Sequence, residues 1–174
     1  IVQVASAGMA DHTTPVPCPV QHLLADGSFA ITVHSRSSLA TGPDSAVVVE
    51  LLDLAAADAV RAPVWVGGWT RRVTGAALAG VLDDIAAADP KSDLLDVGHR
   101  DTLLLLTVES IVFADATGAE DVDRGAILAA RPDPFCQVEA AWVHHLEHHH
   151  PEMVERLRIH LPRNMRRGPI RLLG

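Results

Sequence analysis

Apolar segments bounded by turn residues fill much of the first 130 residues, and in 28–34 large apolar residues occupy every second position, as they do in a strand that buries one face. These patterns predict strands at 19–25, 28–34, 46–54, 60–69 and 102–114, with a weaker one around Val2 and Val4. The segment 102–114 is too long for a flat strand, so we expect it to bend. Asp26-Gly27 predicts a two-residue hairpin turn, and Gly67-Gly68 predicts a bulge or a close approach between backbones.

Helices are predicted between and after these strands, where the apolar spacing changes to three and four residues. The alanine-rich segment 74–88 can be capped by Thr74, and 123–130 forms a second, short helix. Beyond Pro132 two helices are expected to meet at Pro151, which suits the first position of a helix because its missing N–H costs nothing there. The predicted buried face of the first of this pair consists of Phe135, Val138, Trp142, Leu146 and His149.

The order of these elements predicts a β-rich body followed by a helical annex. Several strands joined by short connections, one of them a clear hairpin, favour an antiparallel barrel or sandwich for residues 1–131. Residues 132–174 are predicted to form a small C-terminal domain that ends in a strand at 169–173. The chain starts at Ile1 and stops within that predicted strand, so we expect both ends to be incomplete.

The composition fits a globular protein with a substantial core, because 48% of the residues are hydrophobic and 21% are charged. No apolar run approaches the roughly 20 residues of a membrane span, so no membrane association is expected. The two cysteines form no spacing motif, and a reduced, cytoplasmic location is the expectation. The net charge of −8 and the few aromatic residues argue against nucleic-acid binding.

The charge is unevenly distributed along the chain. Residues 1–130 carry 17 acidic and 7 basic side chains, whereas residues 131–174 carry 5 acidic and 7 basic ones. Six arginines and no acid lie between Arg156 and Arg171. This arginine-rich segment can meet an anionic ligand, a protein partner or the acidic body of its own molecule, and we favour the last interpretation.

Five of the ten histidines lie within residues 144–150. On a helix His144 and His148 share one face, as do His145 and His149, and this spacing presents two imidazoles to one metal ion. Two ligands do not complete a site. We therefore favour solvated or helix-capping histidines, and keep His144 and His148 as the alternative metal ligands.

The predicted strands hold the other candidate residues. No nucleophile elbow, P-loop, dinucleotide fingerprint or paired-cysteine zinc motif occurs in the chain. His34, beside Arg36, is either a polar strand end or a contact to a ligand or phosphate. Trp65 and Trp69 flank the glycine pair and either pack in the core or open a flat slot for a ring system. Arg61, on the same predicted strand face as Trp65, can reach an anion.

Four phrases in the predicted body, at 24–28, 38–40, 49–55 and 61–69, resemble the flavin-binding split barrels of the haem-utilisation (HugZ-like) type. These barrels are relatives of pyridoxamine-phosphate oxidase. A fifth phrase, at 139–152, is the more specific match. It resembles the small domain that is appended to such barrels and also occurs in glutamyl-tRNA reductase-binding proteins. The resemblance spans most of the chain.

The resemblance implies an α+β fold: an antiparallel split β-barrel with flanking helices, plus a small C-terminal α+β domain. It also implies a homodimer with ligands in clefts at the subunit interface. Flavin-binding members carry a basic residue on the strand before the first hairpin, and residues 19–24 contain none, which argues against FMN. Arg36, Ser37 and Ser38 can partly replace it. No axial haem ligand carries over to a histidine of this sequence.

Three functions follow as expectations. The first is a haem-binding or haem-degrading protein whose barrel cleft holds the porphyrin. Its candidate cofactor-binding residues are His34, Arg36, Ser37, Ser38, Arg61 and Trp65. The second is a non-catalytic dimeric binding or regulatory module that uses the arginine-rich segment for a protein partner. The third is a flavin-dependent oxidoreductase, which the missing basic residue makes the least favoured.

Overall fold

A computed structural model describes the chain except for residues 1, 7–14, 55–59, 132–137, 169 and 171–174. The chain forms two compact units, one made of residues 1–53 and 61–130 and the other of residues 54–60 and 131–174. The predicted strand at 169–173 falls outside the described residues, apart from Ile170. In the part of the chain that is described, no helix is both long enough and apolar enough to cross a membrane.

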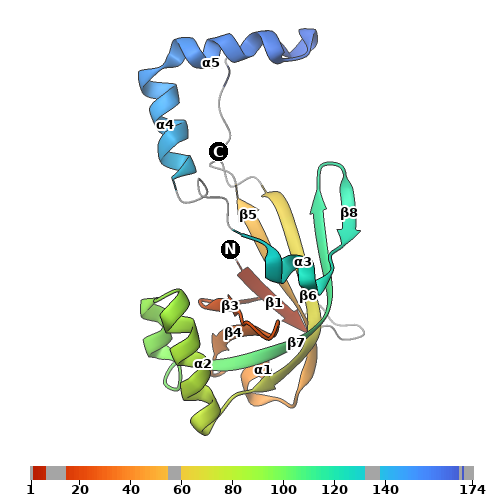
Figure 1. Ribbon diagram of the computed structural model, residues 1–174, viewed down its shortest axis with the longest axis vertical. Coiled ribbons are helices and arrows are strands. Elements are labelled where there is room, and N and C mark those ends of the chain that lie inside the picture. Colours follow the sequence, from red (N-terminus) through yellow and green to blue (C-terminus); the bar gives the residue numbers. More distant parts are fainter. Residues whose placement is uncertain (1, 7–14, 55–59, 132–137, 169, 171–174) are drawn as a thin grey trace. The chain divides into compact units, whose positions relative to one another are not determined.

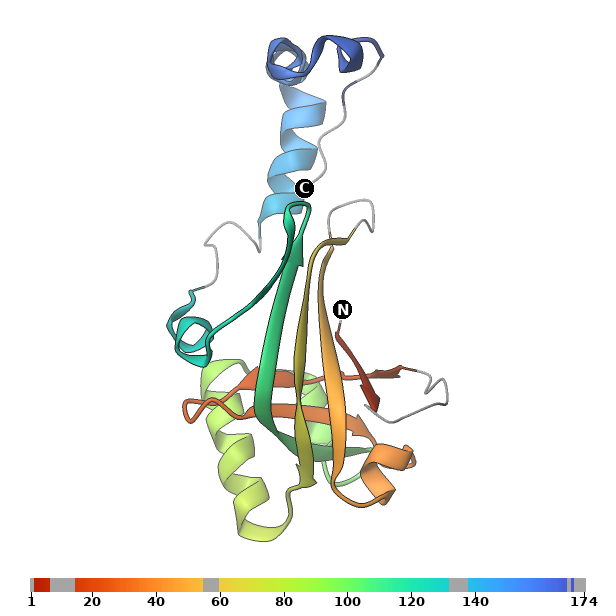
Figure 2. The same ribbon diagram turned by 90° about the vertical axis from the view of Figure 1, so that its right-hand side faces the viewer.

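The first unit is built on an eight-stranded sheet in the order β2-β1-β5-β6-β7-β4-β3, with β8 paired to β7 (Figures 1 and 2). The strands are β1 (Val2–Ser6), β2 (Val16–Pro17), β3 (Gln21–Leu23), β4 (Phe29–His34), β5 (Ser45–Leu54), β6 (Val60–Arg72), β7 (Asp101–Asp115) and β8 (Gly118–Asp121). The helices are α1 (Ser38–Thr41), α2 (Gly75–Ala88) and α3 (Arg124–Ala129), with a 3-10 turn at Ser92–Asp96. This is an α+β architecture with a mostly antiparallel open sheet, consistent with a split barrel.

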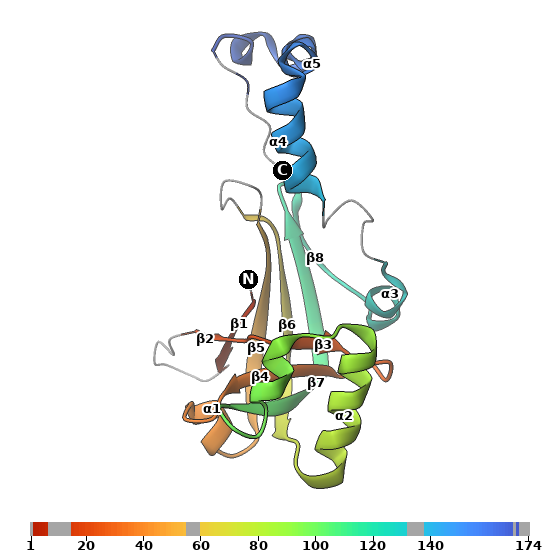
Figure 3. The ribbon, with the colours of Figure 1, turned by 90° about the vertical axis from the view of Figure 1, so that its left-hand side faces the viewer.

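The core of this unit has two layers, because β4 and β7 are buried on both faces. Phe29 and Ile31 of β4 join side chains of β5 and β6 in one layer, whereas Ala30 between them joins Ile85 of α2 in the other. The four leucines at 103–106 alternate between the layers in the same way. Figure 3 shows α2 lying over this part of the sheet. A strand that is buried on both faces therefore has a continuous run of apolar residues in its sequence.

The long strand β7 bends, as its length led us to expect (Figure 2). A register shift against β6 falls between Gly67 and Gly68 and leaves Glu109 of β7 as the extra residue. A Cβ atom on Gly68 would lie 2.0 Å from the carbonyl oxygen of Thr107. The predicted bulge and the predicted close approach are therefore both present, and the bulged residue lies on the partner strand.

The hairpin between β3 and β4 differs by one residue from the prediction. The N–H of Leu24 donates to the carbonyl of Ser28 at 2.9 Å, which leaves a three-residue loop rather than the predicted two-residue turn. Gly27 closes this loop with a φ of 78°, a left-handed conformation that glycine adopts without steric cost. Three-residue loops of this kind also use an Asp-Gly pair, so the dipeptide predicted the hairpin but not its length.

Helix capping follows the sequence in one case and departs from it in another. Asp123 precedes α3, and its carboxylate accepts hydrogen bonds from the N–H groups of Gly125 at 2.7 Å and Ala126 at 3.3 Å. Thr74 precedes α2, but its side chain makes no capping hydrogen bond. The start of α2 is instead marked by Gly75, whose φ of 61° turns the chain into the helix.

The second unit holds two helices that meet at a proline, as predicted. They are α4 (Glu139–His149) and α5 (Pro151–Leu157), followed by 3-10 turns at Arg158–His160 and Arg163–Met165. Pro151 occupies the first turn of α5, and Glu152 stands in the same turn near the positive end of the helix dipole. Val154 is the buried residue of α5.

The buried face of α4 is not the one that the sequence predicted. Val138 is 41% exposed and Trp142 is 58% exposed, whereas Val143 and Leu146 are half-buried. His149 is exposed as well. Apolar residues at spacings of three and four occur on two faces of this helix, so the pattern alone could not select between them. Phe135 lies outside the described residues.

Candidate functional site

The outer face of β6 carries two tryptophans with a glycine between them. Val64 and Val66 of β6 pack in the core, so Trp65, Gly67 and Trp69 stand on the opposite face of the strand. Trp69 is 51% exposed and Trp65 is half-buried. We name Trp65, Gly67 and Trp69 the tryptophan row. Of the two interpretations, packing in the core is therefore wrong for Trp69, which lies on the sheet surface, whereas Trp65 is partly covered.

Contacts with the neighbouring strands shape the tryptophan row. The indole N–H of Trp65 donates to a carboxylate oxygen of Glu50 on β5 at 2.9 Å, which fixes the orientation of the ring. A Cβ atom on Gly67 would lie 2.6 Å from the hydroxyl of Ser110 on β7, so the Ser110 side chain covers the glycine that separates the two tryptophans along the strand. The row is a flat, mostly apolar surface with one fixed and one more exposed indole.

An arginine that the sequence analysis did not select extends this row. Arg71 follows Trp69 by two residues in β6, and its side chain is exposed. Alternation along a strand places it on the same face as the tryptophans. The signal was present in the sequence, because positions 65, 67, 69 and 71 share one strand parity. Arg61 lies in β6 four residues before Trp65, and its side chain is outside the described part of the chain.

His34 and its neighbours lie at the end of β4. The His34 side chain is exposed, and its Nδ1 accepts a hydrogen bond from the backbone N–H of Arg36 at 3.2 Å. In the neutral ring the proton is then on Nε2, which makes His34 a hydrogen-bond donor to a ligand. Ser37 caps α1, because its hydroxyl accepts from the N–H of Ala40 at 3.2 Å. The side chains of Arg36 and Ser38 are exposed. We name residues 34–38 the His34 corner.

The His34 corner and the Trp65 end of the tryptophan row are far apart along β7. His34 is paired with Asp101 at the start of β7, whereas Trp69 is paired with Thr107 and Trp65 with Val112 of the same strand. Eleven residue steps separate Asp101 from Val112, or about 36 Å measured along the strand and not through space, because β7 bends. A single chain therefore brings His34, Arg36, Ser37 and Ser38 together, and separates them along β7 from Trp65.

The histidines of α4 stack in two columns. The rings of His144 and His148 are stacked with centroids 4.0 Å apart, and Nδ1 of His148 is 2.9 Å from the carbonyl oxygen of His144. His145 lies 4.9 Å from His149 and 5.0 Å from His150, measured between ring centroids. In the side-chain conformations observed, no three His, Cys, Asp or Glu residues of the described chain are arranged to hold a metal ion.

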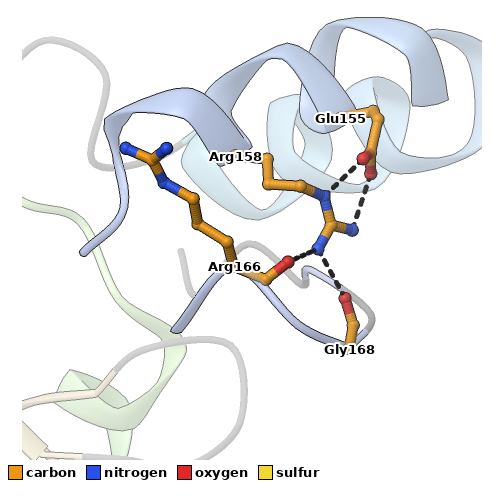
Figure 4. A network of polar contacts seen from close by, with 4 residues as sticks. All are labelled: Glu155, Arg158, Arg166 and Gly168. Atoms are coloured by element: carbon orange, nitrogen blue, oxygen red, sulfur yellow. Dashed lines mark hydrogen bonds and ion pairs between the residues drawn. The ribbon is translucent and has the colours of Figure 1, made fainter. Parts of the chain in front are cut away.

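Arg158 organises the arginine-rich segment (Figure 4). Its guanidinium donates to both carboxylate oxygens of Glu155, one of them at 2.8 Å, and to the carbonyls of Arg166 and Gly168, the latter at 2.9 Å. These bonds hold the pKa of the Glu155 carboxyl below its usual range. Arg166 in turn donates to the carbonyl of Leu161 at 2.8 Å. Two of the arginines therefore hold their own unit together.

A groove of about 560 Å³ runs beside Arg158 in the same unit. Its lining combines charged and apolar side chains from both helices, among them Glu147, His148 and Val154. The side chains of Arg156, Arg163 and Arg167 are exposed. The unit thus presents both a partly polar groove and exposed cationic side chains.

Cys18 is a structural residue and not a reactive thiol. Its side chain is buried in the first core layer, and burial raises the pKa of the thiol to about 12. A thiol with such a pKa is protonated at neutral pH and is a poor nucleophile. Cys136 lies outside the described residues.

Comparison with known proteins identifies the fold. No protein-family model matches the chain, and no curated protein matches it by sequence. The structure is similar to that of a haem-binding protein from Mycobacterium smegmatis, with a TM-score of 0.51 and 21% sequence identity, over 90% of this chain and 67% of the other. A general stress protein 26 from Jannaschia sp. CCS1 matches with a TM-score of 0.43 and 17% identity, over 67% of this chain and 71% of the other.

Proposed function

We propose that this protein binds haem, with the porphyrin on the tryptophan row of β6. The observation that carries the proposal is the pair of indoles on one face of β6, one of them half exposed, in a fold that a haem-binding protein also has. A porphyrin is a flat apolar ring, and aromatic side chains contact such rings by offset stacking. Half of the Trp69 surface is available for such contact.

The propionates of haem require cationic or hydrogen-bonding partners. Arg71 is exposed beside the tryptophan row and can supply one charge-assisted contact. In the His34 corner, Arg36 is exposed and the His34 ring is a donor through Nε2. With Nδ1 accepting from the backbone, the Nε2–H group of His34 can donate to a propionate.

We further propose that the functional form is a homodimer. Within one chain, eleven residue steps of β7 separate the strand position of His34 from that of Trp65. In a homodimer of split barrels, a ligand at the subunit interface contacts both chains. Residues that one chain keeps apart can then contribute to one site, which is how His34, Arg36, Ser38 and Trp65 can share a ligand.

Titration with haemin, followed by the Soret absorbance, tests the proposal. We expect a saturable shift at one haem per chain. Trp69→Ala should weaken binding about tenfold, because loss of one stacking contact to a flat aromatic ligand costs on the order of 1–3 kcal/mol. Trp142→Ala is the matched control, since Trp142 is similarly exposed but belongs to the second unit. Its affinity for haem should equal that of the unmodified protein.

Three results would contradict this assignment: no Soret shift, an unchanged affinity in Trp69→Ala, or an equal loss in Trp142→Ala. A parallel titration with FMN, followed by flavin fluorescence, separates haem binding from flavin binding. Size-exclusion chromatography with light scattering tests the dimer. A monomer that binds haem with full affinity would refute the shared site while leaving haem binding in place.

A second candidate function, a protein-binding module, is favoured by the outer surface of α5. Met153 and Leu157 are exposed there, and the guanidinium of Arg156 lies 3.8 Å from the sulfur of Met153. An exposed apolar pair with an arginine between them is suited to an acidic, partly apolar protein surface. A dimer that takes up neither haem nor FMN would favour this function over the first.

A further inference from the structure

His145 is the centre of a group of three imidazoles at the corner between α4 and α5. His149 follows it by four residues, so both rings project from one face of α4. His150 ends that helix, and its ring meets His145 edge to face. We name His145, His149 and His150 the His145 cluster. All three side chains are exposed, so their rings can turn without disturbing buried packing.

The ring separations in this cluster suit metal coordination. Because imidazole nitrogens bind Zn²⁺ at about 2.0–2.1 Å, two imidazoles on one tetrahedral ion have ring centres roughly 5 Å apart. The observed centroid distances from His145 are 4.9 Å to His149 and 5.0 Å to His150. The rings do not converge on one point as they stand, so binding requires side-chain rotation, which the exposure of all three residues allows.

The other histidine column is less suited to a metal ion. His144 and His148 have ring centroids 4.0 Å apart, which is closer than the roughly 5 Å expected for two imidazoles on one tetrahedral ion. The interplanar angle does not separate the two pairs, because it is 29° here and 31° between His145 and His149. Each of these two histidines also lacks a third imidazole comparable to His150. The structure therefore favours a different set of ligands from the one that helical spacing alone suggested.

Two features hold the His145 cluster in place. The backbone of His150 is fixed between the helices, because its N–H donates to Leu146 at 3.0 Å and its carbonyl accepts from Met153 at 2.9 Å. Nδ1 of His150 lies 3.5 Å from a carboxylate oxygen of Glu152. A carboxylate at one ring nitrogen is the usual outer partner of a metal-binding histidine, since it leaves Nε2 for the metal.

We propose that His145, His149 and His150 bind one divalent transition-metal ion, of the class that prefers imidazole, such as Zn²⁺, Ni²⁺ or Cu²⁺. Three protein ligands leave one position of a tetrahedral ion for water or a further ligand. The bound ion would join the end of α4 to the start of α5 and stabilise the corner between them. This site is separate from the haem site proposed above, because it lies in the other unit.

Titration of the full chain with Zn²⁺ alone, in competition with a chromophoric chelator, tests the proposal. We expect one tight site per chain. Loss of an outer-shell partner of a metal ligand typically lowers metal affinity 10–100-fold. His145→Gln and His150→Gln each remove a proposed ligand itself and should lower the affinity for Zn²⁺ by more than that. Glu152→Gln removes such a partner and should cost about tenfold. His144→Gln and His148→Gln are the matched controls and should change affinity less than twofold.

Substitution by Co²⁺ supplies a second readout, because tetrahedral and octahedral Co²⁺ differ strongly in visible absorbance. An intense visible band, lost in His145→Gln and kept in His144→Gln, is the expected result. Equal losses in the His145 and His144 variants would show a diffuse histidine surface and overturn the proposal. Absence of a stoichiometric Zn²⁺ site would also overturn it. Far-ultraviolet circular dichroism checks that each variant keeps its helices.

Discussion

Replacing Gly68 by alanine tests the close approach between β6 and β7. A Cβ atom at this position would lie 2.0 Å from the carbonyl oxygen of Thr107 and 3.1 Å from a methyl carbon of Leu106. The carbonyl belongs to the backbone of a strand held by its hydrogen-bonded neighbours, so it cannot rotate away. The strands would have to separate at the register shift, next to the tryptophan row.

The structure ranks three glycine-to-alanine substitutions. At Gly68 the clash is with backbone, so we expect a loss of about 3 kcal/mol, at the upper end of overpacking costs. At Gly67 the nearest atom is the Ser110 hydroxyl at 2.6 Å, which can change rotamer, and the loss should be nearer 1 kcal/mol. At Gly80, inside α2, no atom lies within 4 Å, and alanine should stabilise by up to about 1 kcal/mol.

Urea unfolding followed by tryptophan fluorescence measures this series, because Trp65 and Trp69 flank the substituted positions. Thermal unfolding provides a second measure, at about 2–4 °C per kcal/mol for a chain of this size. The expected order of stability is Gly80→Ala, then the unmodified protein, then Gly67→Ala, then Gly68→Ala. A Gly68→Ala variant within about 0.5 kcal/mol of the unmodified protein would refute the close approach of the two backbones.

Two further predictions concern buried groups of the first unit. The hydroxyl oxygen of Thr32 accepts a hydrogen bond from the buried N–H of Val20 at 3.0 Å. Thr32→Val removes this acceptor and should lower the free energy of unfolding, measured in urea, by about 1–3 kcal/mol. Thr32→Ser keeps the hydroxyl and should lower it less. Equal losses would contradict this role of the hydroxyl. Burial raises the pKa of the Cys18 thiol to about 12, whereas the thiol of the unfolded chain has a pKa of roughly 8.5. Between these two pH values only the unfolded chain loses the thiol proton, so the free energy of unfolding should fall as pH rises through this range. In a Cys136→Ser variant, the remaining Cys18 thiol should react with iodoacetamide only when the protein unfolds. A Cys18→Ser variant should not show the loss of stability at alkaline pH. Fast labelling of the folded protein would contradict the burial of Cys18.

The strands of the first unit were predictable because buried strands are apolar segments bounded by turn residues. Residues 28–34 alternate and contain β4, whereas 46–54 and 60–69 are mostly apolar runs that belong to β5 and β6. The four leucines at 103–106 do not alternate, and only the structure explains them: one face of β7 meets the first core layer and the other meets α2. The length of a hairpin loop was less predictable, since Asp26-Gly27 suits both two-residue and three-residue loops.

The buried face of α4 was not predictable from the pattern. Helical spacing allowed a face through Val138 and Trp142 as well as one through Val143 and Leu146. The choice depends on what packs against the helix, and that information lies in residues distant in the sequence. The role of a single residue was also predicted wrongly where it depends on backbone geometry. Thr74 has the residue type of a helix cap, but its side chain does not make the bond.

The candidate site was only partly predictable, for a reason of topology. Parity along the predicted strand 60–69 groups Trp65 with Trp69, whereas Arg71 joins them only because β6 continues to Arg72. Whether His34 joins them depends on the register of β4 and β6 on β7, which no local pattern encodes. The sequence could therefore nominate side chains that suit a flat anionic ligand, but it could not state which of them one chain holds together.

The proposed haem site and the proposed metal site predict opposite effects for the variants Trp69→Ala and His145→Gln. Trp69 belongs to the first unit and the His145 cluster to the second, so the two ligands should be lost independently. Trp69→Ala should lose haem affinity and keep the Zn²⁺ site, and His145→Gln should do the reverse. If His145→Gln lost haem as well, with its helices intact, then an imidazole of α4 would be a haem ligand. The porphyrin could then no longer be assigned to the tryptophan row alone.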